Sequence, residues 1–253
     1  MHEKQFVVVM IQNSEYNTED EEIAGDRRNG RHGTVLCLNE KNCLRQRTVP
    51  CLSSIVYSKE VKMSDSDMKK AIICMADGME MCECLLTVDI LRRAGVEVTT
   101  ASVMEHIAVI ASHQVKIYAD AMIDDIDFDS ADLLVLPGGR IGTENLGTSE
   151  LIRKQCASFA ASDEKYLAAV CAAPSVLADL GLLTGKTATC HPDFEDRVAA
   201  GGAALTHDSV TVCGNIITGQ GLGATMDFAL TLTEILTDKE TADRIRKATC
   251  YRY

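Results

Sequence analysis

The sequence predicts an α/β protein with a doubly wound, mostly parallel sheet and helices on both faces. Short, wholly apolar runs such as 71–76 and 133–136 are typical of strands buried on both faces. These runs alternate with longer segments of helical spacing, such as 79–94. Strands separated by helices form parallel sheets, and functional sites of such sheets lie at the carboxyl ends of the strands.

The expected elements follow one another along the C-terminal three quarters of the chain. Strands are expected where apolar or β-branched residues run together, and helices where apolar residues recur every three to four positions. Gly95 ends the first helix and Pro174 opens a later one, as these residues commonly do. The expected strands are 71–76, 96–101, 115–118, 133–136, 166–170, 187–190, 210–212 and 216–218, and the expected helices are 79–94, 151–161, 175–180, 223–236 and 239–248.

The chain is expected to divide near residue 63. Residues 1–62 show no sustained helical or strand period, and their acidic and basic residues balance, so the net charge of -12 arises from 63–253. We interpret 1–62 as an N-terminal extension that is disordered or only locally ordered, or that reflects an upstream start. A small regulatory cap is the alternative. Residues 63–253 then form the single folded domain.

The composition restricts the classes of function. A net charge of -12 and a pI near 4.9 argue against partners such as nucleic acid and anionic membrane surfaces. No stretch approaches the roughly 20 apolar residues of a transmembrane helix. The 11 cysteines have irregular spacing and follow no secretory signal, which indicates free thiols in a cytoplasmic protein. Their spacing from histidines matches no metal site, and we expect neither a metal nor an organic cofactor.

Cys171 is the candidate nucleophile. It follows the apolar run 166–170 and precedes small residues and Pro174, which reads as a strand, a sharp turn and a helix. The serine version of this layout is the nucleophile elbow of α/β-hydrolases. A thiol at a helix N-terminus is expected to have a lowered pKa. The alternative is a buried structural cysteine in front of a helix.

Partners for Cys171 are expected where other strands end. Glu83 lies in the first turn of the first helix among apolar neighbours, so its carboxyl is expected to be buried and to have a raised pKa. Glu80 is the competing candidate. His191 follows the expected strand 187–190 and is the nearest downstream histidine, although an ordinary loop histidine is an equal alternative. Gly138 and Gly139 either turn backbone N–H groups toward a bound carbonyl or only form a tight turn.

Several motifs in one order resemble the DJ-1/ThiJ/PfpI superfamily, in the branch that includes the Parkinson-associated protein and bacterial ThiJ-like proteins. Any one of them is weak, but together they span about 180 residues and are specific. They are MEMCE at 79–83 with 88–95, VLPGG at 135–139, AVCAAP at 169–174, His191-Pro192, and GQGLGATMDF at 219–228.

The resemblance implies a flavodoxin-like α/β sandwich, as in class I glutamine amidotransferases, that usually forms a homodimer. It implies Cys171 as the reactive thiol, Glu83 as its protonated carboxyl partner, His191 nearby, and backbone donors from Gly139 and Ala172. Some relatives carry an arginine in the segment 110–114, where this chain has His113. Arg140, directly after the glycines, is expected to supply positive charge in its place.

The resemblance also implies an activity. The expected function is that of a cofactor-free, glutathione-independent glyoxalase or deglycase, which converts small α-oxoaldehydes such as methylglyoxal to 2-hydroxy acids. The alternative is a redox-sensing stress-response protein or chaperone that uses oxidation of Cys171. A PfpI-type cysteine peptidase is a third alternative. It is disfavoured because Ala172 stands where that branch carries a histidine directly after the nucleophile.

Overall fold

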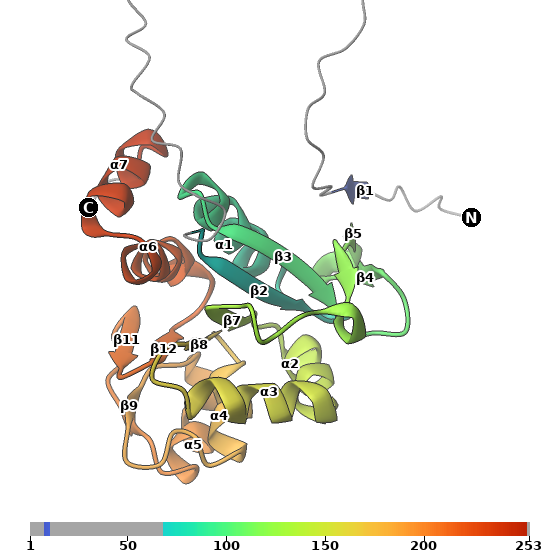
Figure 1. Ribbon diagram of the computed structural model, residues 1–253. Coiled ribbons are helices and arrows are strands. Elements are labelled where there is room, and N and C mark those ends of the chain that lie inside the picture. Colours follow the sequence, from blue (N-terminus) through green and yellow to red (C-terminus); the bar gives the residue numbers. More distant parts are fainter. Residues whose placement is uncertain (1–7, 11–67, 252–253) are drawn as a thin grey trace, which may run out of the picture. The chain divides into compact units, whose positions relative to one another are not determined.

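The computed structural model describes residues 8–10 and 68–251. Its centre is a seven-stranded sheet, with helices on both sides of it (Figure 1). The strand order is β11-β12-β8-β7-β2-β3-β6. Every neighbouring pair is parallel except β11 with β12, which confirms the expected mostly parallel α/β sheet. The strands are β2 Lys70–Met75, β3 Glu97–Ser102, β6 Ala121–Met122, β7 Leu133–Leu136, β8 Tyr166–Val170, β11 Val210–Cys213 and β12 Ile216–Gly219.

The central strands are apolar because both of their faces are covered. Alternate residues of β2, for example Ile72 and Ile73, belong to separate core clusters on opposite faces of the sheet. One face packs against α3, α4 and α5, and the other packs against α1 and α6, with α7 lying against α6 (Figure 1). The helices are α1 Met81–Arg93, α2 Arg140–Thr148, α3 Glu150–Ala160, α4 Pro174–Asp179, α5 Glu195–Ala200, α6 Thr225–Leu236 and α7 Lys239–Ala248.

Two expected strands lie outside the central sheet. The segment expected at 115–118 is β5, Lys116–Tyr118, and pairs with β4, Ala108–Ile110, and β1, Val8–Met10, in a three-stranded sheet. The segment expected at 187–190 is shorter, with β9 at Thr187–Ala188 paired to β10 at Ala204–Leu205. The reason for the shortening is that the Thr189 N–H leaves the ladder and donates to the Thr218 side chain at 2.9 Å.

Helix α2 was not predicted from the sequence, because it contains two glycines and glycine disfavours helix formation. One of them, Gly142, is required by packing: a Cβ there would lie 2.6 Å from the Cα of Met79. Short 3₁₀ turns complete the described elements, namely η1 Ser112–Gln114, η2 Ile123–Asp125, η3 Pro192–Phe194 and η4 Leu222–Ala224.

No helix within residues 68–251 is both long and apolar enough to cross a membrane. The expectation for 1–62 as an extension lies outside the described residues, apart from the short strand β1, so it stays a prediction.

Candidate active site

Cys171 occupies a sharp turn between β8 and α4. Its φ is 64°, in the left-handed region that residues other than glycine seldom adopt. The turn is fixed on both sides, because the Cys171 N–H donates to the Gly219 carbonyl at 2.9 Å and the Cys171 carbonyl accepts from the His191 N–H at 2.8 Å. Strained backbone of this kind costs about 1–3 kcal/mol and occurs mainly at functional sites. The geometry matches the elbow expected from the sequence.

Gly138 is the position that lets a carboxyl group approach the thiol. A Cβ on this glycine would lie 2.5 Å from the Cβ of Cys171 and 2.5 Å from Oε2 of Glu83. The Gly138 N–H instead donates to Glu83 Oε2 at 3.0 Å. The end of β7 therefore supplies a hydrogen-bond donor and no side chain between the two groups.

Glu83, and not Glu80, is the carboxyl that faces Cys171. Its side chain is 1 % exposed, in the first turn of α1. Burial raises the pKa of Glu83 to about 7, and hydrogen bonds with the Cys171 thiol and the Gly138 N–H only partly oppose this rise. The predicted raised pKa is confirmed. A carboxyl group with a pKa near neutrality can act as both acid and base at physiological pH.

The expected lowering of the thiol pKa is wrong for this arrangement. Burial raises the pKa of Cys171 to about 12, and the negative charge of Glu83 together with its hydrogen bond adds to the rise. The N–H groups of Gly139 and Ala172 hydrogen-bond to the thiol and act in the opposite direction. The elbow therefore holds a thiol next to an ionisable carboxyl, which is a group able to accept a proton.

The two backbone donors expected from the sequence do face the sulfur of Cys171. Gly139 has a φ of 89°, and a Cβ there would lie 2.5 Å from both the Glu80 nitrogen and the Gly78 oxygen, so only glycine fits. Ala172 is the residue after the nucleophile and is 1 % exposed. Two N–H groups that converge on one sulfur are also placed to stabilise an oxyanion formed beside it.

His191 reaches the site from a turn and not from a strand of the central sheet. It precedes η3, and its Nδ1 accepts the Asp193 N–H at 3.2 Å, which places the ring proton on Nε2 when the imidazole is neutral. Its side chain is 43 % exposed. Sequence reasoning was right about the proximity of His191 to Cys171 and wrong about the strand that brings it there.

Arg140 does not touch Cys171. It is the first residue of α2, and its Nη2 lies 3.2 Å from Asp193 Oδ2, while its guanidinium lies 5.2 Å from the centre of the Phe194 ring. These contacts join the start of α2 to the turn that carries His191. The positive charge of Arg140 is paired with Asp193. We therefore infer that Arg140 helps to hold the turn that carries His191 in place.

Gly221 was not among the site residues expected from the sequence. A Cβ on it would lie 3.8 Å from the sulfur of Cys171 and 3.7 Å from Cδ2 of His191, so this glycine borders the thiol. The available signal was the glycine-rich run 219–223, which resembles a phosphate-binding loop in spacing alone. In the fold, Gly221 of this run lies next to the thiol and brings no side chain into the space beside it.

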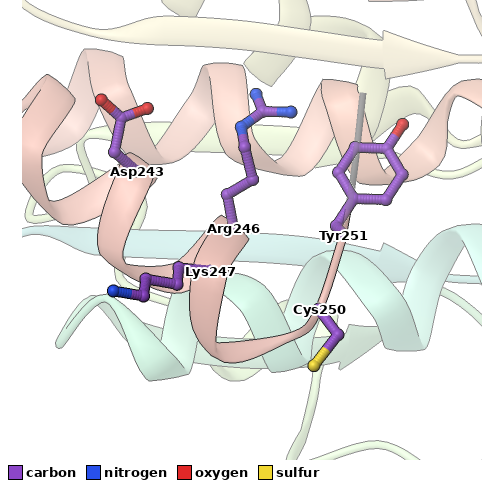
Figure 2. A pocket seen from close by; sticks show the side chains of 5 residues that line it. All are labelled: Asp243, Arg246, Lys247, Cys250 and Tyr251. Carbon is purple, nitrogen blue, oxygen red and sulfur yellow. The ribbon is translucent and has the colours of Figure 1, made fainter.

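A cavity of about 450 Å³ lies elsewhere, at the C-terminal end of α7 (Figure 2). Its lining residues come from α7 and the segment after it, and none belongs to the elements around Cys171: Asp243, Arg246, Lys247, Cys250 and Tyr251. Among the described residues, no group of three or more histidine, cysteine or acidic side chains is placed to hold a metal ion.

Fold and site together define an α/β sandwich protein with a cysteine elbow and a buried glutamate partner. The family model described as the DJ-1/PfpI family matches residues 69–235. The chain is 35 % identical over 185 residues to protein dj-1beta of Drosophila melanogaster, covering 73 % of this chain and 98 % of that protein. The crystal structure of Drosophila DJ-1beta superposes with a TM-score of 0.70 at 34 % identity, over 74 % of this chain and 100 % of that one. The chain belongs to the DJ-1/PfpI family.

Other relatives extend the comparison. Protein DJ-1 homolog B of Arabidopsis thaliana is 40 % identical over 187 residues, which is 74 % of this chain but 42 % of that protein. The chain thus spans less than half the length of that relative. A protein of Caenorhabditis elegans named glutathione-independent glyoxalase DJR-1.2 is 28 % identical over 187 residues, covering 72 % of this chain and 96 % of that one.

Proposed function

We propose that this protein is a cysteine-dependent, glutathione-independent glyoxalase that converts methylglyoxal and related α-oxoaldehydes to 2-hydroxy acids. The observation that carries the proposal is the pair of Cys171 and Glu83, in which a carboxyl with a pKa of about 7 lies against the thiol. The name of the Caenorhabditis elegans relative supports the same activity.

The first step uses the carboxylate form of Glu83. As the sulfur of Cys171 attacks the aldehyde carbon, a C–S bond forms, the carbonyl π bond breaks, and Glu83 accepts the thiol proton. The N–H groups of Gly139 and Ala172 stabilise the oxyanion, which takes the proton back from Glu83 to give a hemithioacetal and leaves Glu83 as a carboxylate. Because the base is within the site, the reaction does not require a thiol that is already ionised.

The second step moves a proton between neighbouring carbons. Glu83, assisted by His191, removes the proton from the former aldehyde carbon and returns it to the former ketone carbon, while the hydroxyl proton passes from the former aldehyde oxygen to the former ketone oxygen. The aldehyde carbon is oxidised to a thioester while the ketone carbon is reduced to an alcohol, so no external oxidant or reductant is consumed. Water then cleaves the thioester, which releases lactate and restores the Cys171 thiol.

The test is lactate formation from methylglyoxal in buffer without glutathione. We expect turnover by the wild type, loss by at least about 100-fold in Cys171→Ala and Glu83→Gln, and wild-type rates in the control Cys213→Ala, which removes a partly exposed thiol on β11. A Cys171→Ala variant that still forms lactate at the wild-type rate contradicts the proposal.

Oxidation of Cys171 is the second candidate function. The thiol is partly accessible, and the same N–H groups and a protonated Glu83 are placed to hydrogen-bond to sulfinate oxygens. Two equivalents of peroxide oxidise the thiol first to a sulfenic acid and then to the sulfinate, and each equivalent is reduced to water. Peptide mass spectrometry after peroxide treatment tests it: selective sulfinate at Cys171 supports a sensor, and equal oxidation of Cys171 and Cys213 opposes it.

We further propose a cytoplasmic homodimer, on the resemblance of the chain to its family. All eight cysteines within the described residues are free, which agrees with a reducing environment. Light scattering of the purified protein tests the dimer. The proposal that 1–62 is dispensable is tested by deleting it, and loss of soluble folding would refute it.

A further inference from the structure

Glu80 does not contact Cys171, yet it is bonded to the structure that holds the site together. It caps α1: its carboxylate accepts the Cys82 N–H at 3.3 Å and the Ser112 hydroxyl at 3.0 Å. Its own N–H donates to the carbonyl of Gly138 at 2.9 Å. The N–H of the same Gly138 donates to the Glu83 carboxyl. Gly138 is therefore hydrogen-bonded to Glu80 through its carbonyl and to Glu83 through its N–H.

We propose that Glu80 and Ser112 form a positioning pair for Glu83: Ser112 fixes the Glu80 carboxylate, and Glu80 fixes Gly138 and the first turn of α1. This inference rests on the proposed function, because it assigns residues that act through Glu83. Both are positioning residues and not catalytic residues, since neither reaches the sulfur of Cys171.

Gly138 has no space to shift, because its Cα faces Cys171 and Glu83 so closely that even a methyl group would clash. Its carbonyl is held by Glu80 and its N–H by Glu83. A small movement of Glu80 therefore alters both the hydrogen bond to Glu83 and the distance between Glu83 and the thiol.

Ser112 lies in a segment that is hydrogen-bonded to the turn before α1. Its N–H donates to the Met79 carbonyl at 2.7 Å, and the Gly78 N–H donates to the Ile110 carbonyl at 2.8 Å. The two residues after Ser112, His113 and Gln114, have φ values of 56° and 66°. This segment therefore combines a strained backbone with hydrogen bonds to the turn before α1. Strain of this kind persists where the surrounding structure fixes the position of a segment, as we infer for the segment that holds Glu80.

Glu80 also acts on Glu83 through its charge. The negative charge of Glu80 raises the pKa of Glu83, in the same direction as burial, which is the larger cause. The other ionisable groups that face Glu83 are Cys171 across the site and Cys82 and Cys84 on α1. Arg140 and His191 flank the site from the start of α2 and from η3, with Arg140 paired to Asp193.

The test measures the ionisation of Glu83 and does not depend on catalytic turnover. The rate at which iodoacetamide alkylates Cys171 is measured across pH by peptide mass spectrometry, and its midpoint reports the ionisation of Glu83. Glu80→Gln removes the charge, keeps one acceptor oxygen and replaces the other by an amide that can donate to the Ser112 hydroxyl. In this variant we expect the midpoint to move to lower pH. The movement should correspond to less than about fivefold in proton affinity, the limit for a partly exposed charge.

Ser112→Ala tests the second member of the pair. We expect the alkylation rate above the midpoint, and kcat for methylglyoxal with KM unchanged, to fall by about three- to tenfold, and Ser112→Thr to restore both. The matched controls Glu150→Gln and Ser149→Ala, at the start of α3, should match the wild type. An unchanged midpoint in folded Glu80→Gln, or no rescue by Ser112→Thr, overturns the inference.

Failure of the proposed function gives a different result from failure of this inference. If the wild type forms no lactate, the glyoxalase proposal fails, while the alkylation midpoints still test the positioning pair. Circular dichroism and thermal unfolding of each variant confirm that it is folded before the midpoints are compared.

Discussion

The carboxyl of Glu83 hydrogen-bonds with the thiol of Cys171, and Gly138 leaves no room for a side chain beside them. The two groups come from α1 and from the turn after β8, two segments that lie far apart in the sequence. Burial raises the pKa of both groups, so each is held in an environment that disfavours its charge. The parallel sheet brings them together because both segments adjoin the carboxyl ends of its strands.

Gly138→Ala should abolish the reaction. The added methyl would lie 2.5 Å from Cys171 Cβ and from Glu83 Oε2, so the thiol and carboxyl must separate. We expect at least a 100-fold loss of lactate formation and about 1–3 kcal/mol of destabilisation from overpacking. The matched control is Gly147→Ala in α2, where the new methyl would lie 3.5 Å from Val176 Cγ2. That variant should retain activity, and equal losses in both variants would contradict this account.

The pH dependence of kcat/KM should follow Glu83. Because the carboxylate form accepts the thiol proton, activity should rise with pH through a midpoint near the Glu83 pKa of about 7. Steady-state rates between pH 5 and 9 with methylglyoxal measure this. A profile that falls across this range, or keeps rising to pH 9 without a plateau as a thiol with a pKa of about 12 would require, would show that Glu83 is not the base.

Glu83→Gln should stabilise the protein at alkaline pH. The folded-state pKa of about 7 exceeds the reference value of 4.5, so the wild type is most stable below the reference value and loses stability as pH rises through about 7. The amide has no such loss. We expect the free energy of unfolding of the variant, relative to wild type, to increase by about 3 kcal/mol between pH 4.5 and pH 8.

Chemical denaturation at several pH values measures that difference. A constant difference between Glu83→Gln and wild type would mean that the buried carboxyl does not carry the raised pKa. A decrease with rising pH would mean that the ionised carboxylate is the form that the fold prefers.

The pair of Arg140 and Asp193 should affect activity more than stability. Both side chains are largely exposed, with 63 % and 59 % of their surface accessible, so their removal should change stability by less than about 1 kcal/mol. Asp193 also donates its N–H to His191, so loosening this turn should lower kcat by a few fold. Arg140→Ala and Asp193→Ala should be equal in effect and not additive in a double-mutant cycle. Fully additive losses would show that Arg140 does not act through the turn.

Much of the fold was predictable because its signals are local. The apolar run at 133–136 is typical of a strand covered on both faces, and the structure has β7 there. The pair of β9 and β10 was not predictable, since the strand at 187–190 ends early through a bond between the Thr189 backbone and the Thr218 side chain. Contacts of this kind depend on residues far apart in the sequence.

The candidate site shows the same division. Cys171 and Glu83 were predictable from an elbow pattern and from apolar neighbours in a first helical turn. The thiol pKa was not, because the helix N-terminus suggested a lowering while burial and the Glu83 charge dominate in the fold. Ser112 gave no signal at all, since its contact with Glu80 depends on the position of a strained 3₁₀ turn.

The most direct test of the central claim is to look for the covalent intermediate on Cys171. The wild type is mixed with methylglyoxal at pH 8 without glutathione, quenched with acid during turnover, and mapped by peptide mass spectrometry. The account predicts a methylglyoxal-derived adduct on Cys171 that decays as lactate appears and that Glu83→Gln strongly diminishes. Lactate formation without any adduct on Cys171, or with an undiminished adduct and rate in Glu83→Gln, would contradict it.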